Sequence, residues 1–231
     1  MLEAHAHRRR RDYQYFMGPS GNVWQFVSRM ETLYRSLIML ERVRGVDLTK
    51  ARILDVGSSY GGDGLAKFMA LSFSCKQLYG IDILEERIER GKDMYPGLNL
   101  YHGDATEMSF GSEEFDIVME QFCFCHIAEE NVRAKIAKEM IRVTKTDGHI
   151  LIFDWIIGRK GASINGLPLR KIRNLFGVGD KTSLVKRYPG QLLPPIGRLV
   201  STFAPMFYPL VQRLFPVAVG SKLTILTPIR K

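Results

Sequence analysis

Apolar residues along the chain change between two spacings, one typical of helices and one typical of strands. Residues 23–45 carry apolar groups three or four positions apart, which predicts an amphipathic helix. Short apolar runs then alternate with helical stretches, a pattern typical of βαβ crossovers and a parallel sheet covered on both faces. Residues 145–148, Lys-Thr-Asp-Gly, predict a turn before the fifth strand. The expected strands are 52–56, 77–83, 98–102, 115–122 and 149–156, and the expected helices are 64–72, 85–94 and 129–143.

The C-terminal third follows a different pattern. We expect a helix over 169–176 and strands over 182–188 and 221–227. Residues 192–219 are apolar but contain five prolines, which exclude one long helix and predict two short kinked ones. The expected fold is α/β, a doubly wound, seven-stranded, mostly parallel Rossmann-like sheet. Its last strand runs antiparallel beside the fifth, after a helical insertion at about 191–219. Residues 1–45 are expected to form an N-terminal helical cap on a domain of residues 46–231.

Charge is spread unevenly. The net charge of +9 divides into +4 over residues 1–50, −7 over 51–157 and +12 over 158–231, where Asp180 is the one acidic residue. A basic region attracts anionic partners, although a solubilising surface explains it equally well. The three cysteines and the lack of a leader-like apolar stretch after Arg8–Arg11 favour a reduced, cytoplasmic protein.

Three acidic residues stand at the ends of three successive predicted strands. Asp55 precedes a turn crowded with glycines, among them Gly57 and Gly61, and Asp82 ends the second strand. Asp104 follows the third strand in Gly103-Asp-Ala105. Open α/β sheets bind ligands at this edge, where glycine lets the backbone approach closely. A carboxylate beside the first turn suits a cationic ligand better than a pyrophosphate. Asp82 can accept hydrogen bonds from a ribose, and Asp104 from an exocyclic amine.

These segments resemble the ordered motifs of class I S-adenosylmethionine-dependent methyltransferases. The resemblance covers residues 45–157 and departs at Ser59, where the family usually has glycine. It implies that S-adenosyl-L-methionine is the cofactor, with Asp55 and Gly57 beside its methionine part, Asp82 on its ribose and Asp104 with Ala105 on its adenine. It also implies that residues 119–122 pass under the transferring methyl group. The remaining cofactor-binding candidates are Ser58, Ser59, Gly61, Ile83, Gln121 and Phe122.

The outer segments are similar to a narrower group, bacterial methyltransferases of polysaccharide and lipopolysaccharide biosynthesis. These segments are Tyr13–Phe16, Leu40–Arg42, Arg170–Phe176 and Leu192–Pro195. The similarity implies an O-methyltransferase acting on a sugar of a bacterial surface glycan or its anionic or lipid-linked precursor. The alternatives are a methyltransferase of RNA or of a small secondary metabolite, and a non-catalytic cofactor-binding regulator. Nucleic acid is disfavoured because the sequence shows no known RNA-binding module.

Three side chains are candidates for the catalytic base that an acceptor hydroxyl needs. Asp154 lies near the end of the fifth predicted strand, His126 follows the fourth, and Glu120 lies within it. Each also has a structural interpretation, such as capping a loop or a helix. Cys123 and Cys125 lack a matching pair for a zinc site, so we interpret them as packing residues and expect no metal. His5 and His7 are interpreted as incidental. Tyr13, Tyr15 and Phe16 are interpreted either as a cap over the cofactor or as core.

The apolar stretch 199–211 is bracketed by Arg198 and Arg213 and has two interpretations. It is too short and too broken by proline to span a bilayer. It either packs as a lid over the acceptor site or lies in the headgroup region of anionic lipid, at the inner face of the membrane.

Overall fold

The computed structural model describes residues 23–61, 64–158 and 164–229, and the chain divides into two compact units. Among the described residues, the sheet unit contains 37–61, 64–158, 164–187 and 223–229, and the helical unit contains 23–36 and 188–222. The chain passes between the units within helix α2 (Val23–Arg44) and strands β6 (Thr182–Pro189) and β7 (Ser221–Pro228). Gly62 of the first turn lies outside the described residues, as do His5, His7, Tyr13, Tyr15 and Phe16.

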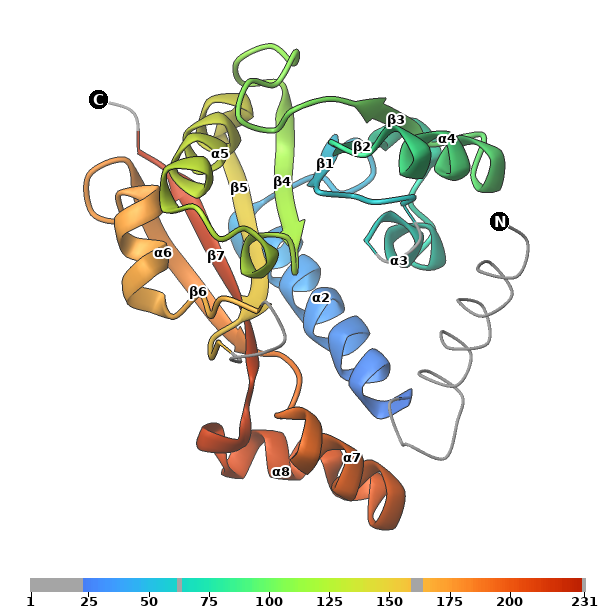
Figure 1. Cartoon of the computed structure of the whole chain (residues 1–231), viewed down its shortest axis with the longest axis vertical. Coiled ribbons are helices and arrows are strands. Elements are labelled where there is room, and N and C mark those ends of the chain that lie inside the picture. Colours follow the sequence, from blue (N-terminus) through green and yellow to red (C-terminus); the bar gives the residue numbers. More distant parts are fainter. Residues whose placement is uncertain (1–22, 62–63, 159–163, 230–231) are drawn as a thin grey trace. The chain divides into compact units, whose positions relative to one another are not determined.

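Seven strands form one sheet in the order β3-β2-β1-β4-β5-β7-β6 (Figure 1). Strands β1 to β5 pair with one another in parallel. Strands β6 and β7 are antiparallel, because Gly190 N donates to Ser221 O at one end and Ile229 N to Lys181 O at the other. The predicted seven-stranded, mostly parallel fold is therefore confirmed. The first five strands are β1 (Ile53–Val56), β2 (Leu78–Asp82), β3 (Asn99–His102), β4 (Phe115–Gln121) and β5 (Thr144–Trp155).

Helices connect the strands of the sheet unit, and their apolar stripes pack onto it. Helix α5 buries Ile136, Met140 and Val143, three or four residues apart, against β4 and β5. Helix α6 ends at Gly177, whose positive φ of 57° suits the left-handed position after a helix. The helices of this unit besides α2 are α3 (Leu65–Ala70), α4 (Glu85–Met94), α5 (Glu130–Val143) and α6 (Leu169–Phe176), with 3₁₀ turns η1 (Cys75–Gln77) and η2 (Phe124–His126).

The predicted turn at residues 145–148 is wrong. Strand β5 already begins at Thr144, which pairs with Phe115, while Ile117 pairs with His149. The Lys-Thr-Asp-Gly segment is therefore a bulge inside β5, where the extra residues leave the pairing. Lys145 stabilises it through an ion pair of 2.7 Å with Asp116, and Gly148 packs closely on the β4 backbone.

The helical unit joins the first part of α2 to the C-terminal insertion. Ser28 Oγ donates to Gly190 O over 2.9 Å, and Thr32 Oγ1 donates to Pro189 O over 2.8 Å. These bonds join residues 23–36 to the insertion in one compact unit, and the N-terminal cap over residues 1–45 stays a prediction. The insertion contains the two short helices that its prolines predict. Its elements are α7 (Pro194–Phe203), η3 (Pro205–Phe207), α8 (Tyr208–Leu214) and η4 (Pro216–Ala218).

Candidate active site

The turn after β1 has the backbone shape that its glycines predict. Gly57 and Gly61 have φ values of 76° and 78°, in the left-handed region that favours glycine. Ser59 has a φ of 53°, so the residue that departs from the usual glycine adopts a glycine-like conformation. The Gly57 and Ser58 amides both donate to Ile81 O, at 2.9 and 3.0 Å. The turn is thereby fixed to the end of β2.

Asp82 ends β2 with most of its side chain buried. Its Oδ2 accepts from Ser59 N over 2.8 Å, and its Oδ1 accepts from Leu84 N over 3.0 Å. A carboxylate has about four acceptor positions, so Asp82 keeps capacity for two hydroxyl donors. Ile83, directly beside it, is 64% exposed and offers an apolar surface. This donor and acceptor set fits a ribose with its attached base.

Asp104 and Ala105 lie at the same edge of the sheet. His102 is in register with Asp82, and Gly103 N donates to Asp82 O over 3.0 Å. Asp104 is exposed, and its Oδ1 accepts from Thr106 N over 2.8 Å. The structure therefore brings Asp104 next to the end of β2, and its contact with adenine stays a prediction.

Cys123, just after β4, lies among four carboxyl groups. Burial raises the pKa of its thiol well above the ordinary value, and the four nearby carboxyl groups raise it further. Carboxyl groups gathered in this way disfavour an anionic ligand and suit a positively charged one, such as the sulfonium of S-adenosylmethionine. The four groups belong to Glu120, Asp154, Asp82 and Asp55, which come from four different strands.

Two of the candidate bases are buried. Glu120 Oε2 accepts from Cys123 N over 3.0 Å, and Asp154 Oδ2 accepts from Cys125 N over 2.8 Å. Burial raises the pKa of Glu120 well above its ordinary range, and the neighbouring Asp154 raises it further. Burial likewise raises the pKa of Asp154, to about 6. Both carboxyl groups therefore hold the backbone of the loop after β4 from inside the fold.

The third candidate base, His126, is exposed at the end of η2. Asn165 N donates to Cys125 O over 2.7 Å, which ties the segment after β5 to this turn. Phe122 has a φ of 56° and stacks near Phe153 and Trp155, at centroid distances of 5.4 and 5.6 Å. The turn after β4 thus combines an exposed imidazole with an aromatic wall.

Sequence reasoning missed Lys67 as a member of this site. Lys67 lies in α3, is 3% exposed, and its Nζ donates to Gln121 Oε1. Gln121 was expected to bind the cofactor, so the buried ammonium stands beside a predicted cofactor residue. The signal was a lysine among buried apolar residues of the helix that follows the glycine-rich turn. The site described so far is built from groups of this chain alone, and the described residues contain no cluster of His, Cys, Asp or Glu arranged for a metal ion.

Residues 54–152 match the family model described as a methyltransferase domain. This part of the chain is similar to methyltransferase domains. The match begins in β1 and ends in β5, so it contains the glycine-rich turn, Asp82, Asp104 and the segment after β4. Asp154 lies just beyond it.

Similar proteins agree with this assignment. The phthiotriol/phenolphthiotriol dimycocerosates methyltransferase 1 of Mycobacterium ulcerans is 26% identical over 55% of this chain and 47% of its own length. The chloroplastic tocopherol O-methyltransferase of Arabidopsis thaliana is 27% identical over 45% of this chain and 30% of its own length. The chain therefore matches less than half of either relative.

A solved structure shows the same fold. Geranyl diphosphate C-methyltransferase from Streptomyces coelicolor A3(2), solved with Mg²⁺, geranyl diphosphate and S-adenosyl-L-homocysteine, superposes with a TM-score of 0.58. The superposition covers 85% of this chain and 77% of that one, at 11% sequence identity. This likeness shows that the two chains share a fold.

Proposed function

We propose that this chain is an S-adenosylmethionine-dependent O-methyltransferase acting on a sugar hydroxyl of a bacterial surface glycan or its lipid-linked precursor. The observation that carries the methyl-transfer assignment is the cluster of four carboxyl groups around Cys123, at the strand ends of a methyltransferase domain. Three of its members also border the glycine-rich turn or the loop after β4.

Different residues bind different parts of the cofactor. Asp82 accepts hydrogen bonds from the ribose hydroxyls, Ile83 packs on the adenine, and Asp104 accepts from its amine. The turn at 57–61 lies along the methionine part, close to Asp55. Ala105, Ser58, Gln121 and Phe122 complete the candidate surface. Bound S-adenosylmethionine supplies a methyl group that is activated by its attachment to a sulfonium.

The protein's task in the transfer is to position the acceptor and to remove a proton. The acceptor oxygen forms a bond to the methyl carbon while the bond from that carbon to sulfur breaks. Holding these three atoms in line supplies much of the acceleration. The hydroxyl proton passes to a base, and His126 is the candidate that solvent and acceptor can reach.

The acceptor assignment rests on charge and on the likeness of the outer segments to glycan-modifying enzymes. Residues 158–231 carry a net charge of +12, which favours an anionic acceptor such as a phosphate-linked sugar. The names of the relatives give chemically different acceptors, phthiotriol and phenolphthiotriol dimycocerosates in one case and tocopherol in another. We therefore expect residues outside the matched domain to determine which acceptor binds.

Two measurements test this function. Titration calorimetry should detect S-adenosylmethionine binding, and Asp82→Ala should weaken it by about 1–3 kcal/mol because ribose hydroxyls lose their acceptor. Asp93→Ala, an exposed acidic position on α4, is the matched control. Unchanged affinity in Asp82→Ala would remove the cofactor assignment.

The acceptor is tested by transfer of a labelled methyl group to lipid-linked sugars, nucleotide-linked sugars and RNA. We expect label in a sugar and none in RNA. Label in RNA alone, or in a secondary metabolite alone, would replace the glycan proposal. Cofactor binding without transfer to any of these acceptors would favour the non-catalytic regulator.

A further inference from the structure

The two helices of the insertion expose large apolar side chains, although other apolar residues of the same helices, Ile196, Val200 and Val211, pack inward. On α7, Gly197 and Ser201 are buried, whereas Leu199 and Phe203 are exposed. Each pair is four residues apart and therefore lies along one stripe of the helix. A helix on the surface of a water-soluble domain buries its large apolar residues and exposes its polar ones.

Helix α8 likewise exposes large apolar side chains. Tyr208 and Gln212 are buried, and Leu210 and Leu214 are exposed. The inward polar groups are satisfied, since Gln212 Nε2 donates to Ser28 Oγ over 2.9 Å and Tyr208 Oη accepts from Leu192 N over 3.1 Å. The inner stripes are therefore fixed in place, and the outer stripes cannot rotate inward without breaking these bonds.

The exposed apolar residues continue through the short turns that follow each helix. Phe203, Met206 and Val217 are 79%, 77% and 84% exposed, values unusual for large apolar side chains on a single patch. We call this patch the 199–217 face. It consists of Leu199, Phe203, Met206, Phe207, Leu210, Leu214, Phe215 and Val217.

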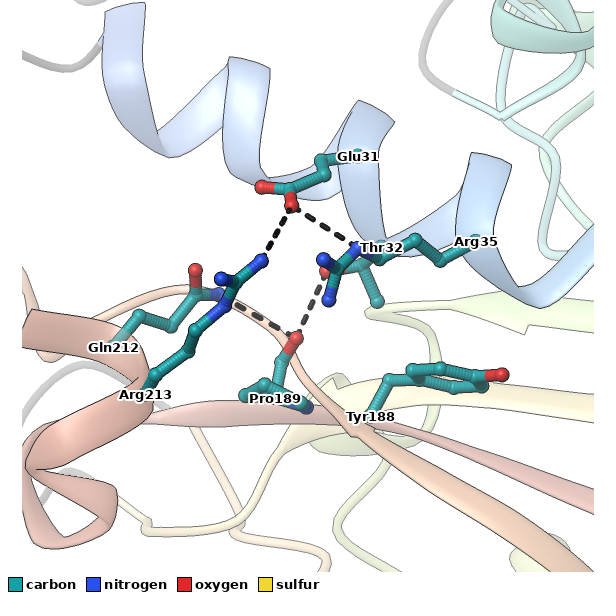
Figure 2. A pocket seen from close by; sticks show the side chains of 7 residues that line it. All are labelled: Glu31, Thr32, Arg35, Tyr188, Pro189, Gln212 and Arg213. Atoms are coloured by element: carbon teal, nitrogen blue, oxygen red, sulfur yellow. Dashed lines mark hydrogen bonds and ion pairs between the residues drawn. The ribbon is translucent and has the colours of Figure 1, made fainter. Parts of the chain in front are cut away.

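Charge around the 199–217 face indicates what covers it. The described residues of the helical unit contain five basic side chains and one acidic side chain, Glu31. Glu31 is engaged, since it pairs with Arg35 over 3.1 Å and with Arg213 over 3.8 Å in the pocket shown in Figure 2. Residues 181–231 contain no acidic residue at all. Two copies meeting through this face would bring like charges together, whereas an anionic surface would complement them.

We propose that the 199–217 face docks on an anionic lipid bilayer. Its phenylalanine, leucine and methionine side chains enter the region between headgroups and acyl chains, and Arg198 contacts the lipid phosphates. None of the helices in the described part of the chain is long and apolar enough to cross a membrane, so the contact is peripheral. Docking would hold the enzyme at the surface where a lipid-linked acceptor resides.

Sedimentation with vesicles tests this proposal on the full chain. The protein should sediment with vesicles of phosphatidylcholine and phosphatidylglycerol, less with phosphatidylcholine alone, and less as salt rises because the charge attraction is screened. Vesicle binding requires neither cofactor nor acceptor, so its outcome is independent of the proposed methyl transfer. Failure to sediment with anionic vesicles at any ionic strength would overturn the proposal.

Matched variants locate the contact. The double variant Phe203→Ser/Leu210→Ser should bind at least tenfold more weakly, because two large side chains no longer leave water. Arg198→Gln should weaken binding about fivefold. Val43→Ser, which changes a 73% exposed apolar residue outside the face, and Lys138→Gln on α5 should bind like the wild type. Wild-type affinity in the double variant would contradict the proposal.

A second measurement guards against misfolding of the double variant. In the conservative variant Phe203→Trp, tryptophan fluorescence should shift to shorter wavelength with anionic vesicles and be quenched by brominated lipid. An introduced tryptophan that stays in water while the protein is vesicle-bound would overturn the assignment of this face. Light scattering of the free wild type should show a monomer. A dimer that Phe203→Ser/Leu210→Ser dissociates would assign the face to a second copy instead.

Discussion

The carboxylate of Asp55 lies against Gly64, so close that a β-carbon at position 64 would stand 1.8 Å from Asp55 Oδ2. Gly64 directly precedes α3, and Asp55 is buried at the third residue of β1. The absent side chain at 64 therefore determines where this carboxylate lies. Both ends of the glycine-rich turn are constrained, one by the backbone conformation of Gly57 and the other by this contact.

Gly64→Ala should displace the Asp55 carboxylate. Overpacking of this kind destabilises by about 1–3 kcal/mol, and S-adenosylmethionine affinity should fall with it. Urea unfolding and titration calorimetry measure the two effects. Gly111→Ala is the matched control, because a β-carbon there would meet no atom nearer than 3.4 Å. Equal stability and affinity in the two variants would show that the Asp55 carboxylate is not held by this contact.

Ser59→Gly should stabilise the protein by up to about 1 kcal/mol. A serine with positive φ is strained by about 1–2 kcal/mol, and glycine removes that strain while costing about 0.5–1 kcal/mol in chain entropy. Ser112→Gly is the control with the opposite sign, because the exposed Ser112 does not have a positive φ and its replacement adds only the entropy cost of glycine. The midpoints of urea unfolding should move in opposite directions. Destabilisation of both variants to the same extent would contradict the strain at Ser59.

His126→Ala should lower kcat by about 10²–10⁴ while S-adenosylmethionine binds as before, because a positioned base contributes about this much. His102→Ala changes an exposed histidine at the end of β3 and serves as the control. Asp154→Asn tests the buried alternative and should also destabilise the loop after β4, since Asp154 accepts from Cys125 N and Trp155 N. Full activity in both single variants and in their double variant would leave positioning alone as the source of catalysis.

The stability of the fold should fall in mild acid because of His149. Its imidazole is buried in β5, and burial together with Arg44 lowers its pKa to about 4. Arg44 Nε donates to the neutral ring over 3.3 Å. The folded pKa lies below the ordinary value, so the unfolded chain takes up the proton first. The neutral His149 therefore contributes fully to the free energy of unfolding above about pH 6.5. This contribution, about 3 kcal/mol, is lost as the pH falls toward about 4.

Unfolding by urea at several pH values measures this effect. His149→Gln keeps an acceptor for Arg44 and should flatten the acid slope relative to the wild type, whereas His126→Gln at the exposed position should not. The raised pKa of Asp154 works in the opposite direction, since its folded state favours the protonated carboxyl below about pH 6. For this reason the difference between variants is the informative quantity. Parallel pH profiles for wild type and His149→Gln would contradict the prediction.

Local signals were sufficient for most of the fold. The strands and helices from residue 53 to residue 143 have ends within two residues of their predicted positions, because apolar spacing changes sharply at each glycine, aspartate or proline. The bulge in β5 was not predicted, because the prediction used local composition alone. Lys-Thr-Asp-Gly has the composition of a turn, and the pairing that keeps it within a strand comes from β4.

Contacts between residues far apart in the sequence could not be predicted from local patterns. Residues 28 and 190 are bonded across 162 positions, and no local pattern places the start of α2 with the insertion. The three candidate bases were alike in sequence because all lie near strand ends. Only the fold distinguishes Glu120 and Asp154, whose oxygens face backbone amides inside the protein, from the exposed His126. Lys67 was missed for a similar reason, because its contact with Gln121 joins two elements that are separate in the sequence.

The order of the strands has a consequence for synthesis on the ribosome. Strand β7 lies between β5 and β6, although it leaves the ribosome after both. In the described sheet β6 pairs with β7 alone, so the nascent chain carries β6 and an open edge of β5 until β7 emerges. About thirty residues separate β6 from β7, which takes roughly 2–6 s at ordinary elongation rates. Throughout that interval the apolar 199–217 segment also emerges, so the nascent chain is expected to need chaperone protection late in translation.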